Sequence, residues 1–407
     1  MSLVDERFRS VFNQFSYFNK VQSDALDDVL HSDSPVVISA PTGCGKTVVF
    51  ELAIIKQLSS REQDTKIIYI APIKALCSER FNDWKRKFSG LGVNILEMTG
   101  DSDESIETLR HHNLIVTTPE KLDSISRWLS LTDPTLMMSF KLIMIDEVHM
   151  LNDKDRGHVL EAVVSRFKTS GCRARFIAVS ATFPNVEDVA LWVGGYDCVF
   201  YKFGEEMRPV QLERVVLGYP MQEGQSEFKF EMNLSYKLDR IINQYSRGEP
   251  TLIFCNSRKS TMNTASVLSK QMSLSVSGEK KRSLMTMVSR INDVKLRELV
   301  TDHCIGYHHA GMSVQDKRLV ETMFGQGLLS VLTCTSTLAL GVNLPAQLVI
   351  IKSTLQMVGG GQWREYSQSQ VSIIEVFTWS IMINNICRFY KWLVEQGDLS
   401  SAGPQVL

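Results

Sequence analysis

The feature that most constrains the fold is a repeated order of short apolar runs separated by segments with helical periodicity. Eight runs rich in Val, Ile and Leu each end in a turn or a small polar cluster, at 36–40, 66–72, 114–119, 141–147, 174–182, 251–257, 329–336 and 346–353. Strands that are buried on both faces of a parallel sheet have such runs, and helices form the crossovers between them. The sequence therefore predicts an α/β protein with doubly wound parallel sheets.

The length of 407 residues suits two or three domains, and the strand–helix alternation is interrupted at one main place. It is lost in EEMRPVQLERVVLGYP (205–220), which contains two prolines. We therefore expect a first domain over 1–205, a linker over 206–220, a second domain over 221–354 and a divergent tail over 355–407. The polar stretch 275–293 is expected to be a helical or mobile insertion in the second domain.

Composition excludes several classes of protein. A formal net charge of -1, from 44 Lys and Arg against 45 Asp and Glu, argues against a uniformly basic nucleic-acid coat but allows a local basic track. The eight cysteines form no Cys-x-x-Cys, so reduced and mostly buried thiols of a cytosolic or nuclear protein are expected, without a zinc site. The N-terminus is charged, and the most apolar later stretch, 371–394, is interrupted by Glu, Asn and Arg. Neither a signal peptide nor a membrane span is predicted.

The segment APTGCGKT (40–47) lies between the first apolar run and a helical segment. Its two glycines would let backbone N–H groups turn toward phosphate oxygens, and the next helix adds the positive end of its dipole. Lys46 would place a charge on the β- and γ-phosphates, and the Thr47 hydroxyl would hold Mg²⁺. The alternative, a glycine-rich turn with a chance Lys-Thr pair, fits the whole pattern less well. The predicted nucleotide-binding residues are Ala40, Pro41, Thr42, Gly43, Cys44, Gly45, Lys46 and Thr47.

A second apolar run, KLIMIDEVHM (141–150), contains two adjacent carboxylates. Asp146 can coordinate Mg²⁺, and Glu147 can accept a proton from the attacking water. Considered alone, the pattern is explained equally well by a strand end with two solvated acids. Because it follows the phosphate loop by 100 residues in the same predicted sheet, it favours a hydrolytic site with Lys46, Asp146 and Glu147 as catalytic residues.

Together these motifs resemble the superfamily 2 helicases with a DExH box, here Asp146-Glu147-Val148-His149. Further motifs follow in the order of that family, namely FNKVQ (18–22), APIKAL (71–76), TGD (99–101), TTPEKLD (117–123), SAT (180–182), RPVQL (208–212), TLIFCNSRKS (251–260), GYHHAGM (306–312) and TSTLALGVNLPA (335–346). The resemblance covers roughly residues 15–354. The last two motifs point to the branch of large processive helicases with superkiller-type, spliceosomal and DNA-repair members. Details such as APIKALCSERFNDW (71–84) are most similar to the eukaryotic meiotic crossover DNA helicases.

The resemblance implies two tandem RecA-like domains, with ATP in the cleft between them and a single nucleic-acid strand across the tops of the sheets. It implies an adenine contact by Gln22, nucleotide contacts by Gly341 and Asn343, and coupling of hydrolysis to strand movement by His149, Ser180, Ala181 and Thr182. It also implies nucleic-acid contacts by Lys74, Thr117, Thr118, Arg258, Thr333 and Thr335. Polar groups at strand ends suit phosphate oxygens, which carry no sequence information. Taken singly, each of these six residues could equally cap a helix or satisfy a turn.

The function implied is that of an ATP-dependent DNA helicase in meiotic crossover formation, with ATP and Mg²⁺ as cofactors. Its partner would be single-stranded or branched DNA, and its location would be the nucleus. An RNA helicase is an alternative, because a reader of the 2′-hydroxyl has no short sequence signature. The motifs give no indication of protein partners.

The resemblance ends near the C-terminus. The next motif of the family, Gln-x-x-Gly-Arg-x-Gly-Arg, provides arginine fingers, and GGGQWREYS (359–367) still resembles the approach to it. From residue 368 the chain departs, and no Gly-Arg-x-Gly-Arg occurs in the 407 residues. We interpret the residues after about Ser369 as the tail of an alternative or truncated product without the later domains of this branch. Arg364 and Arg388 lie outside a matching context, so a regulatory isoform that binds nucleotide and nucleic acid, with little motor activity, is the alternative function.

Overall fold

The structure is a computed structural model in which two compact units, Met1–Pro209 and Val210–Leu407, are each described by themselves. It describes residues 4–41, 43–60, 65–100, 106–153, 156–208, 214–274, 278–335, 338, 344, 346–353, 355–358, 362–365, 379–385 and 405–406. The division falls inside the segment 206–220 that the sequence suggests as a linker.

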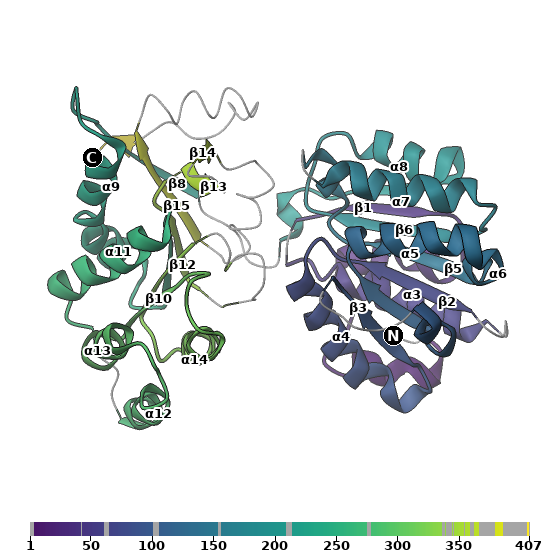
Figure 1. The fold of residues 1–407 in the computed structure, drawn as a ribbon, viewed down its shortest axis with the longest axis horizontal. Helices are drawn as coiled ribbons and strands as arrows, with labels where there is room; N and C mark the ends of the chain where they lie inside the picture. The colour runs from purple at the N-terminus through teal and green to yellow at the C-terminus, as the bar shows by residue number, and fades with distance from the viewer. Residues whose placement is uncertain are drawn as a thin grey trace. The chain divides into compact units, whose positions relative to one another are not determined.

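Among the described residues, the first unit contains a parallel sheet of seven strands in the order β3-β4-β2-β5-β6-β1-β7, with helices on both faces (Figure 1). The strands are β1 (Val36–Ser39), β2 (Lys66–Ile70), β3 (Ile95–Met98), β4 (Leu114–Thr117), β5 (Phe140–Ile145), β6 (Arg175–Ser180) and β7 (Val199–Lys202). The α-helices are α1 (Lys20–Asp24), α2 (Leu26–Leu30), α3 (Thr47–Ser59), α4 (Lys74–Phe88), α5 (Pro119–Thr132), α6 (Pro134–Met138), α7 (Gly157–Thr169) and α8 (Val186–Gly194). Short 3₁₀ turns are η1 (Glu6–Phe12), η2 (Ser89–Leu91), η3 (Ile106–His111), η4 (Val148–Asn152), η5 (Gly195–Asp197) and η6 (Glu205–Met207).

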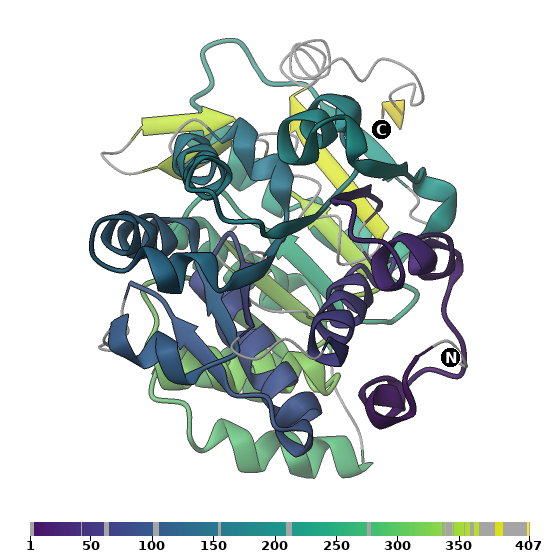
Figure 2. The ribbon, with the colours of Figure 1, turned by 90° about the vertical axis from the view of Figure 1, so that its right-hand side faces the viewer.

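The alternation of side chains along each strand divides the core of this unit into two layers. On β1, Val36 and Ile38 pack with α3, α4 and the N-terminal segment, which is purple in Figure 2. Val37 lies on the opposite face and packs in the layer formed by α5, α7 and α8. Because both faces are buried, the strands read as continuous apolar runs, which is why the sequence shows them so clearly.

Among its described residues, the second unit has a parallel sheet in the order β10-β11-β9-β12-β15-β8-β16 and an antiparallel pair, β13-β14. The strands are β8 (Arg214–Tyr219), β9 (Thr251–Phe254), β10 (Ile305–His308), β11 (Val331–Cys334), β12 (Leu348–Ile351), β13 (Leu355–Val358), β14 (Gln362–Glu365), β15 (Trp379–Asn385) and β16 (Gln405–Val406). The helices are α9 (Glu227–Ser235), α10 (Leu238–Tyr245), α11 (Arg258–Gln271), α12 (Gly278–Val288), α13 (Val294–His303) and α14 (Val314–Gly325).

The predicted α/β fold with two doubly wound domains is confirmed, and all eight apolar runs contain a strand. Some strands lie outside these runs. β3 and β7 are edge strands whose burial alternates, and β8 lies in the second half of the segment suggested as a linker. The polar stretch 275–293 contains α12, whose residues Leu284 and Val288 join the core of the second unit.

Two bulk properties of the chain follow from the described residues. Seven cysteines there are free thiols, and five of them are buried, as the sequence predicts for a reduced protein. Within the same part of the chain, no helix is both long and apolar enough to cross a membrane.

Candidate nucleotide-binding and hydrolysis site

The loop between β1 and α3 is held in a shape that requires glycine. Gly43 and Gly45 have φ values of +84° and +72°, in the left-handed region that favours glycine. A Cβ atom on Gly45 would lie 2.3 Å from Nε2 of Gln22, so a side chain there would also displace its neighbour. The local chain direction therefore depends on both glycines, as a phosphate-binding turn requires.

Two side chains near the start of α1 support this loop from outside. Asn19 Nδ2 donates to the carbonyl of Cys44 at 2.9 Å, and Gln22 Nε2 donates to the carbonyl of Gly45 at 3.1 Å. The same two residues form a capping box, in which each side-chain oxygen accepts from the backbone N–H of the other. Gln22 is thus buried beside the loop with both polar ends engaged, and its contact with adenine stays a prediction.

Lys46 precedes α3, and its ammonium is buried among backbone carbonyls. Its side chain is nearly buried, and Nζ donates to the carbonyls of Ala40 at 2.9 Å and Ser180 at 2.8 Å. Both acceptors are neutral, so neither cancels the positive charge. A phosphate oxygen forms a stronger, charge-assisted bond and can replace them.

Asp146 follows β5 at the same edge of the sheet. Its Oδ2 accepts from the Tyr69 hydroxyl at 2.5 Å, and its Oδ1 accepts from the backbone N–H of Glu147 at 3.0 Å. Burial, followed by the negative charge of Glu147, raises the pKa of Asp146 to about 6. Two adjacent, half-buried carboxylates therefore repel each other, which is the environment that a divalent cation relieves.

Glu147 has an unusual backbone conformation for a residue with a side chain, with φ of +51°. Such left-handed residues cost free energy and concentrate at functional sites. Its Oε2 accepts from the backbone N–H of Ala181 at 3.2 Å and lies 3.3 Å from His149 Nδ1. Burial raises the pKa of this carboxyl, but Lys46 and His149 outweigh it and lower the pKa below its usual value. Glu147 is thus an ionised carboxylate that can accept a proton.

His149 links this acidic segment to the end of β6. Its Nδ1 lies 2.8 Å from the Ser180 hydroxyl, and burial lowers the pKa of the imidazole. Lys46, Glu147 and His149 therefore all contact the Ser180–Ala181 backbone or side chain. Thr182, predicted to act with them, is exposed and takes no part in these three contacts.

The residues fit the magnesium ion that the sequence predicts. Thr47 begins α3 and is half-buried, and it provides a hydroxyl next to the carbonyl-bound Lys46. Asp146 provides a half-buried carboxylate with an elevated pKa. Magnesium prefers such oxygen ligands and completes its shell with water and phosphate oxygens.

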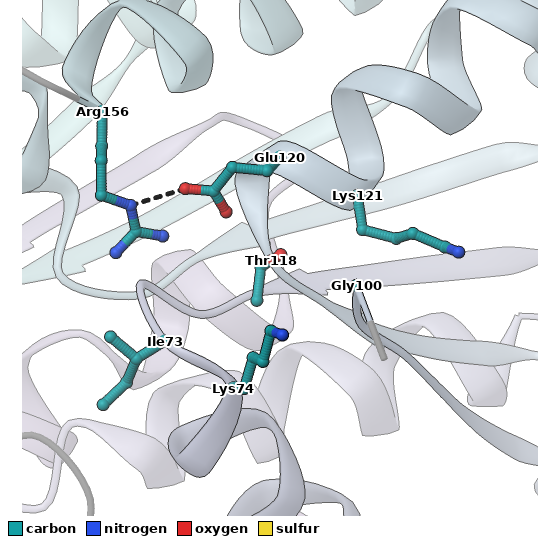
Figure 3. Close-up of a pocket in the computed structure, with 7 residues that line it drawn as sticks. All are labelled: Ile73, Lys74, Gly100, Thr118, Glu120, Lys121 and Arg156. Atoms are coloured by element: carbon teal, nitrogen blue, oxygen red, sulfur yellow. Dashed lines mark hydrogen bonds and ion pairs between the residues drawn. The ribbon is translucent and has the colours of Figure 1, made fainter. Parts of the chain in front are cut away.

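The predicted nucleic-acid residues divide into two groups. Thr117 and Thr333 are fully buried, and their hydroxyls donate to the carbonyls of Met98 at 2.7 Å and Thr261 at 3.0 Å. Both hydroxyls therefore bond inside the fold in this structure, and their direct contact with phosphate stays a prediction. Lys74 and Thr118, in contrast, line one cavity in the first unit (Figure 3).

The remaining predicted residues lie in the second unit or outside the described part of the chain. Arg258 is exposed at the start of α11, and Thr335 is half-buried just after β11. Thr42, Gly341, Asn343 and Arg388 lie outside the described residues. For Arg364, the structure describes the backbone in β14 and not the side chain.

Two supporting residues were not predicted from the sequence. Tyr69 is fully buried in β2, and Asn19 is the N-cap of α1. A tyrosine inside an apolar strand is a usable signal, because a buried hydroxyl needs a polar partner. Nothing in the sequence alone identifies that partner as Asp146.

Comparison with known proteins agrees with this geometry. Residues 19–189 match the model of the DEAD/DEAH box helicase family, and residues 235–369 match the helicase conserved C-terminal domain. The chain is 47% identical over 388 residues to the probable ATP-dependent DNA helicase HFM1 of Homo sapiens, a match that covers 90% of this chain and 27% of the relative. It is 40% identical over 377 residues to the ATP-dependent DNA helicase MER3 of Saccharomyces cerevisiae, which covers 91% of this chain and 31% of the relative. The chain thus spans about 30% of the length of these relatives.

Proposed function

This chain belongs to the superfamily 2 helicases with a DEAD/DEAH box, and we propose that it couples ATP binding and hydrolysis to the separation of DNA strands. The observation that carries the proposal is the convergence of Lys46, Glu147 and His149 on Ser180 and Ala181. The lysine that would bind the nucleotide, the carboxylate that would activate water and the coupling histidine therefore all contact the same two residues.

In the proposed mechanism, the phosphates of ATP enter the Gly43–Thr47 turn. Lys46 exchanges the carbonyls of Ala40 and Ser180 for phosphate oxygens. Mg²⁺, held by Thr47 and Asp146, would neutralise phosphate charge when bound. Glu147 accepts the proton of the attacking water, since its carboxylate is ionised.

The same contacts explain how the nucleotide state reaches the rest of the unit. When Lys46 leaves the Ser180 carbonyl, one of the contacts that hold the end of β6 is lost. The His149–Ser180 and Glu147–Ala181 contacts remain and can follow the shift. A change of a few atoms at the phosphate thus acts on the Ser180–Thr182 segment, the coupling element that the sequence predicts.

We assign single-stranded or branched DNA as the substrate and the nucleus as the location. The support is that the relatives are named ATP-dependent DNA helicases. A role in meiotic crossover formation is supported by the resemblance of the motifs to the meiotic branch. Recognition would be independent of base sequence, because the predicted contacts are to phosphates.

The test is whether nucleotide and DNA affect one another's binding. Anisotropy of a labelled single strand, measured with and without a non-hydrolysable ATP analogue, should show a change in affinity. The change should disappear in Ser180→Ala, which removes the hydroxyl that His149 contacts. Equal affinity with and without the analogue in the wild-type chain would contradict the proposal. The slope of log K against log[salt] should be about -0.7 for each phosphate contacted.

A second function has specific support. The chain has no Gly-Arg-x-Gly-Arg, and the match to the second helicase model ends at residue 369, where the sequence departs from the family. A module that binds ATP and DNA but hydrolyses ATP slowly is therefore the alternative. Replacing the labelled DNA by RNA of the same sequence tests the remaining alternative, an RNA helicase.

A further inference from the structure

A cavity of about 320 Å³ with several charged side chains in its lining lies at the carboxyl edge of the sheet in the first unit, away from the Gly43–Thr47 loop. Its lining residues are Ile73, Lys74, Gly100, Thr118, Glu120, Lys121 and Arg156. Lys74 reaches toward Gly100 and Thr118, whereas Lys121 extends away from Arg156 (Figure 3). Lys74 and Thr118 belong to the predicted nucleic-acid motifs, but no motif includes Arg156.

Arg156 enters this cavity beside a carboxylate. Its Nε donates to Glu120 Oε1 at 2.5 Å, and a dashed line marks this bond in Figure 3. The side chains of Arg156 and Glu120 are 32% and 45% exposed, so neither is sealed from an incoming ligand. Burial raises the pKa of Glu120, but the hydrogen bond from Arg156 outweighs it, so the net shift is downward and the group is an anion.

Glu120 and Arg156 belong to two different segments of the first unit. Glu120 is in the first turn of α5, two residues after Thr118. The backbone N–H of Arg156 donates to Asp153 Oδ1 at 3.0 Å, and that of Gly157 donates to the Asp153 carbonyl at 2.8 Å. The ion pair therefore connects the TTPEKLD segment to the turn that follows η4.

The residue after Arg156 lies in close contact with η4. A Cβ atom on Gly157 would lie 2.1 Å from the carbonyl oxygen of Leu151, which is the fourth residue of η4. η4 begins directly after Glu147 and contains His149. This contact is a route by which a displacement of the Arg156 backbone can reach the segment that carries the proposed base and the coupling histidine.

We propose that Arg156 binds a phosphate of the DNA strand and is paired with Glu120 when no strand is bound. Exchange of the Glu120 carboxylate for the phosphate then transmits strand binding to η4. The proposal rests on the proposed function, since it names a further residue of the same nucleic-acid site. A guanidinium binds carboxylate and phosphate with the same planar fork, so the two anions compete for one cation. Glu120 therefore stands in the place of a DNA phosphate.

This arrangement predicts opposite effects for the two partners. Glu120→Gln removes the competing charge, so the affinity for single-stranded DNA should rise about threefold to tenfold. Arg156→Ala removes the ligand, so the affinity should fall about tenfold, and the salt slope should become shallower by about 0.7. A pair that only stabilises the fold predicts a loss or no change in both variants, since neither would compete with DNA.

The experiment measures anisotropy of a labelled single strand with the wild-type chain, Glu120→Gln, Arg156→Ala and Arg156→Lys. Arg127→Ala is the matched control, because it removes an exposed positive charge from α5, the helix of Glu120, where Arg127 pairs with Asp123. Its affinity for DNA should stay within about twofold of wild type. Arg156→Lys keeps the charge without the planar fork and should be intermediate, which separates phosphate binding from misfolding.

Transmission to η4 has its own measurement. In the wild-type chain, DNA should change the affinity for a fluorescent ATP analogue. In Arg156→Ala this effect of DNA should be lost, whereas the affinity for the analogue without DNA should stay within about twofold of wild type. By linkage the same factor must appear in the effect of the analogue on DNA affinity. A DNA effect that persists in Arg156→Ala overturns the transmission.

The outcomes distinguish this inference from the proposed function. If the wild-type chain binds no DNA, both fail together. If it binds DNA and Arg156→Ala binds equally well, or Glu120→Gln binds more weakly, only the assignment of this pair is overturned. Inorganic phosphate at constant ionic strength tests a site for a free anion. Binding of millimolar phosphate to the wild-type chain, but not to Arg156→Ala, that leaves the affinity for DNA unchanged would overturn the assignment to a DNA strand.

Discussion

Lys46 in the first unit and Lys352 in the second are both buried, but their partners differ in kind. Lys46 donates to two neutral backbone carbonyls. Lys352 is 1% exposed, and its Nζ lies 3.4 Å from the carboxylate of Glu231 and donates to the hydroxyls of Ser235 at 2.7 Å and Thr264 at 3.1 Å. Charge at Lys46 is available for an anion, whereas charge at Lys352 is neutralised inside the protein.

The difference shows that burial of a lysine does not by itself indicate function. Glu231 and Ser235 are on α9, Thr264 is on α11, and Lys352 follows β12, so the second network joins three elements of the core. The first network joins the nucleotide loop to the end of β6, and the two hydrogen-bond acceptors of Lys46 in it carry no charge. A change at Lys352 should affect stability, and a change at Lys46 should affect ligand binding.

The largest expected effect concerns the arginine-finger motif Gly-Arg-x-Gly-Arg, which the sequence does not contain. Replacing the residues after Ser369 by a tail of a family member that contains Gly-Arg-x-Gly-Arg should raise DNA-stimulated phosphate release by about 10³-fold or more. The reason is that an arginine finger stabilises charge in the transition state, whereas the first unit alone can bind ATP. Nucleotide affinity should change by less than about tenfold. Steady-state phosphate release from both chains is the measurement, and turnover of the native chain at about 1 s⁻¹ would contradict the deficiency.

The next effect separates the two lysines by stability. Lys352→Ala leaves the Glu231 carboxylate buried without its cation, which should lower the free energy of unfolding by about 3–5 kcal/mol. Lys46→Ala removes no carboxylate partner and should cost about 1 kcal/mol. Chemical denaturation measures both values. The double variant Lys352→Met with Glu231→Leu should recover most of the loss, and equal costs for the two single variants would remove the distinction.

Ligand binding should show the reverse order. Lys46→Ala should weaken the binding of a fluorescent ATP analogue by about 100-fold. The reason is that the ammonium, which would bind phosphate in place of its two carbonyl partners, is lost. Lys352→Met should leave that affinity within about threefold at a temperature where it is folded. Unchanged affinity in Lys46→Ala would disprove the assignment of the Gly43–Thr47 turn as the nucleotide site.

A smaller effect compares one tyrosine from each unit. Tyr69 donates to Asp146 at 2.5 Å, and Tyr307 donates to Asp293 at 2.6 Å. Either change to Phe should cost about 1–2 kcal/mol of unfolding free energy, since one hydrogen bond to a carboxylate is lost. Only Tyr69→Phe should alter the Mg²⁺ concentration needed for nucleotide binding, because only its partner is a proposed metal ligand. A magnesium titration of analogue binding checks this, and equal shifts in both variants would argue against that role of Asp146.

The sequence predicts strands best where both faces are buried. The runs at β1, β2 and β5 are continuously apolar, but the edge strand β7 alternates between half-buried and exposed residues and has no such run. β10 lies in a motif and not in an apolar run, because Gly306 and His308 interrupt the apolar pattern of this short strand. Thr117 and Thr333 had the polar chemistry expected of phosphate ligands, yet the backbone carbonyl next to each hydroxyl is brought there by the neighbouring segments of the fold.

The sequence by itself determined the alternation of buried strands and helices, the turn that needs Gly43 and Gly45, and the chemistry of Lys46, Asp146 and Glu147. These depend on local backbone preferences and on residue type, which are readable within a few neighbouring positions. Only the tertiary structure decided which partner each polar group meets. Tyr69 reaches Asp146 and His149 reaches Ser180 because parallel pairing places the ends of β2, β5 and β6 at one edge. Glu120 meets Arg156 for a similar reason, since 36 residues separate them in the chain and only the packing of α5 beside α7 brings them together.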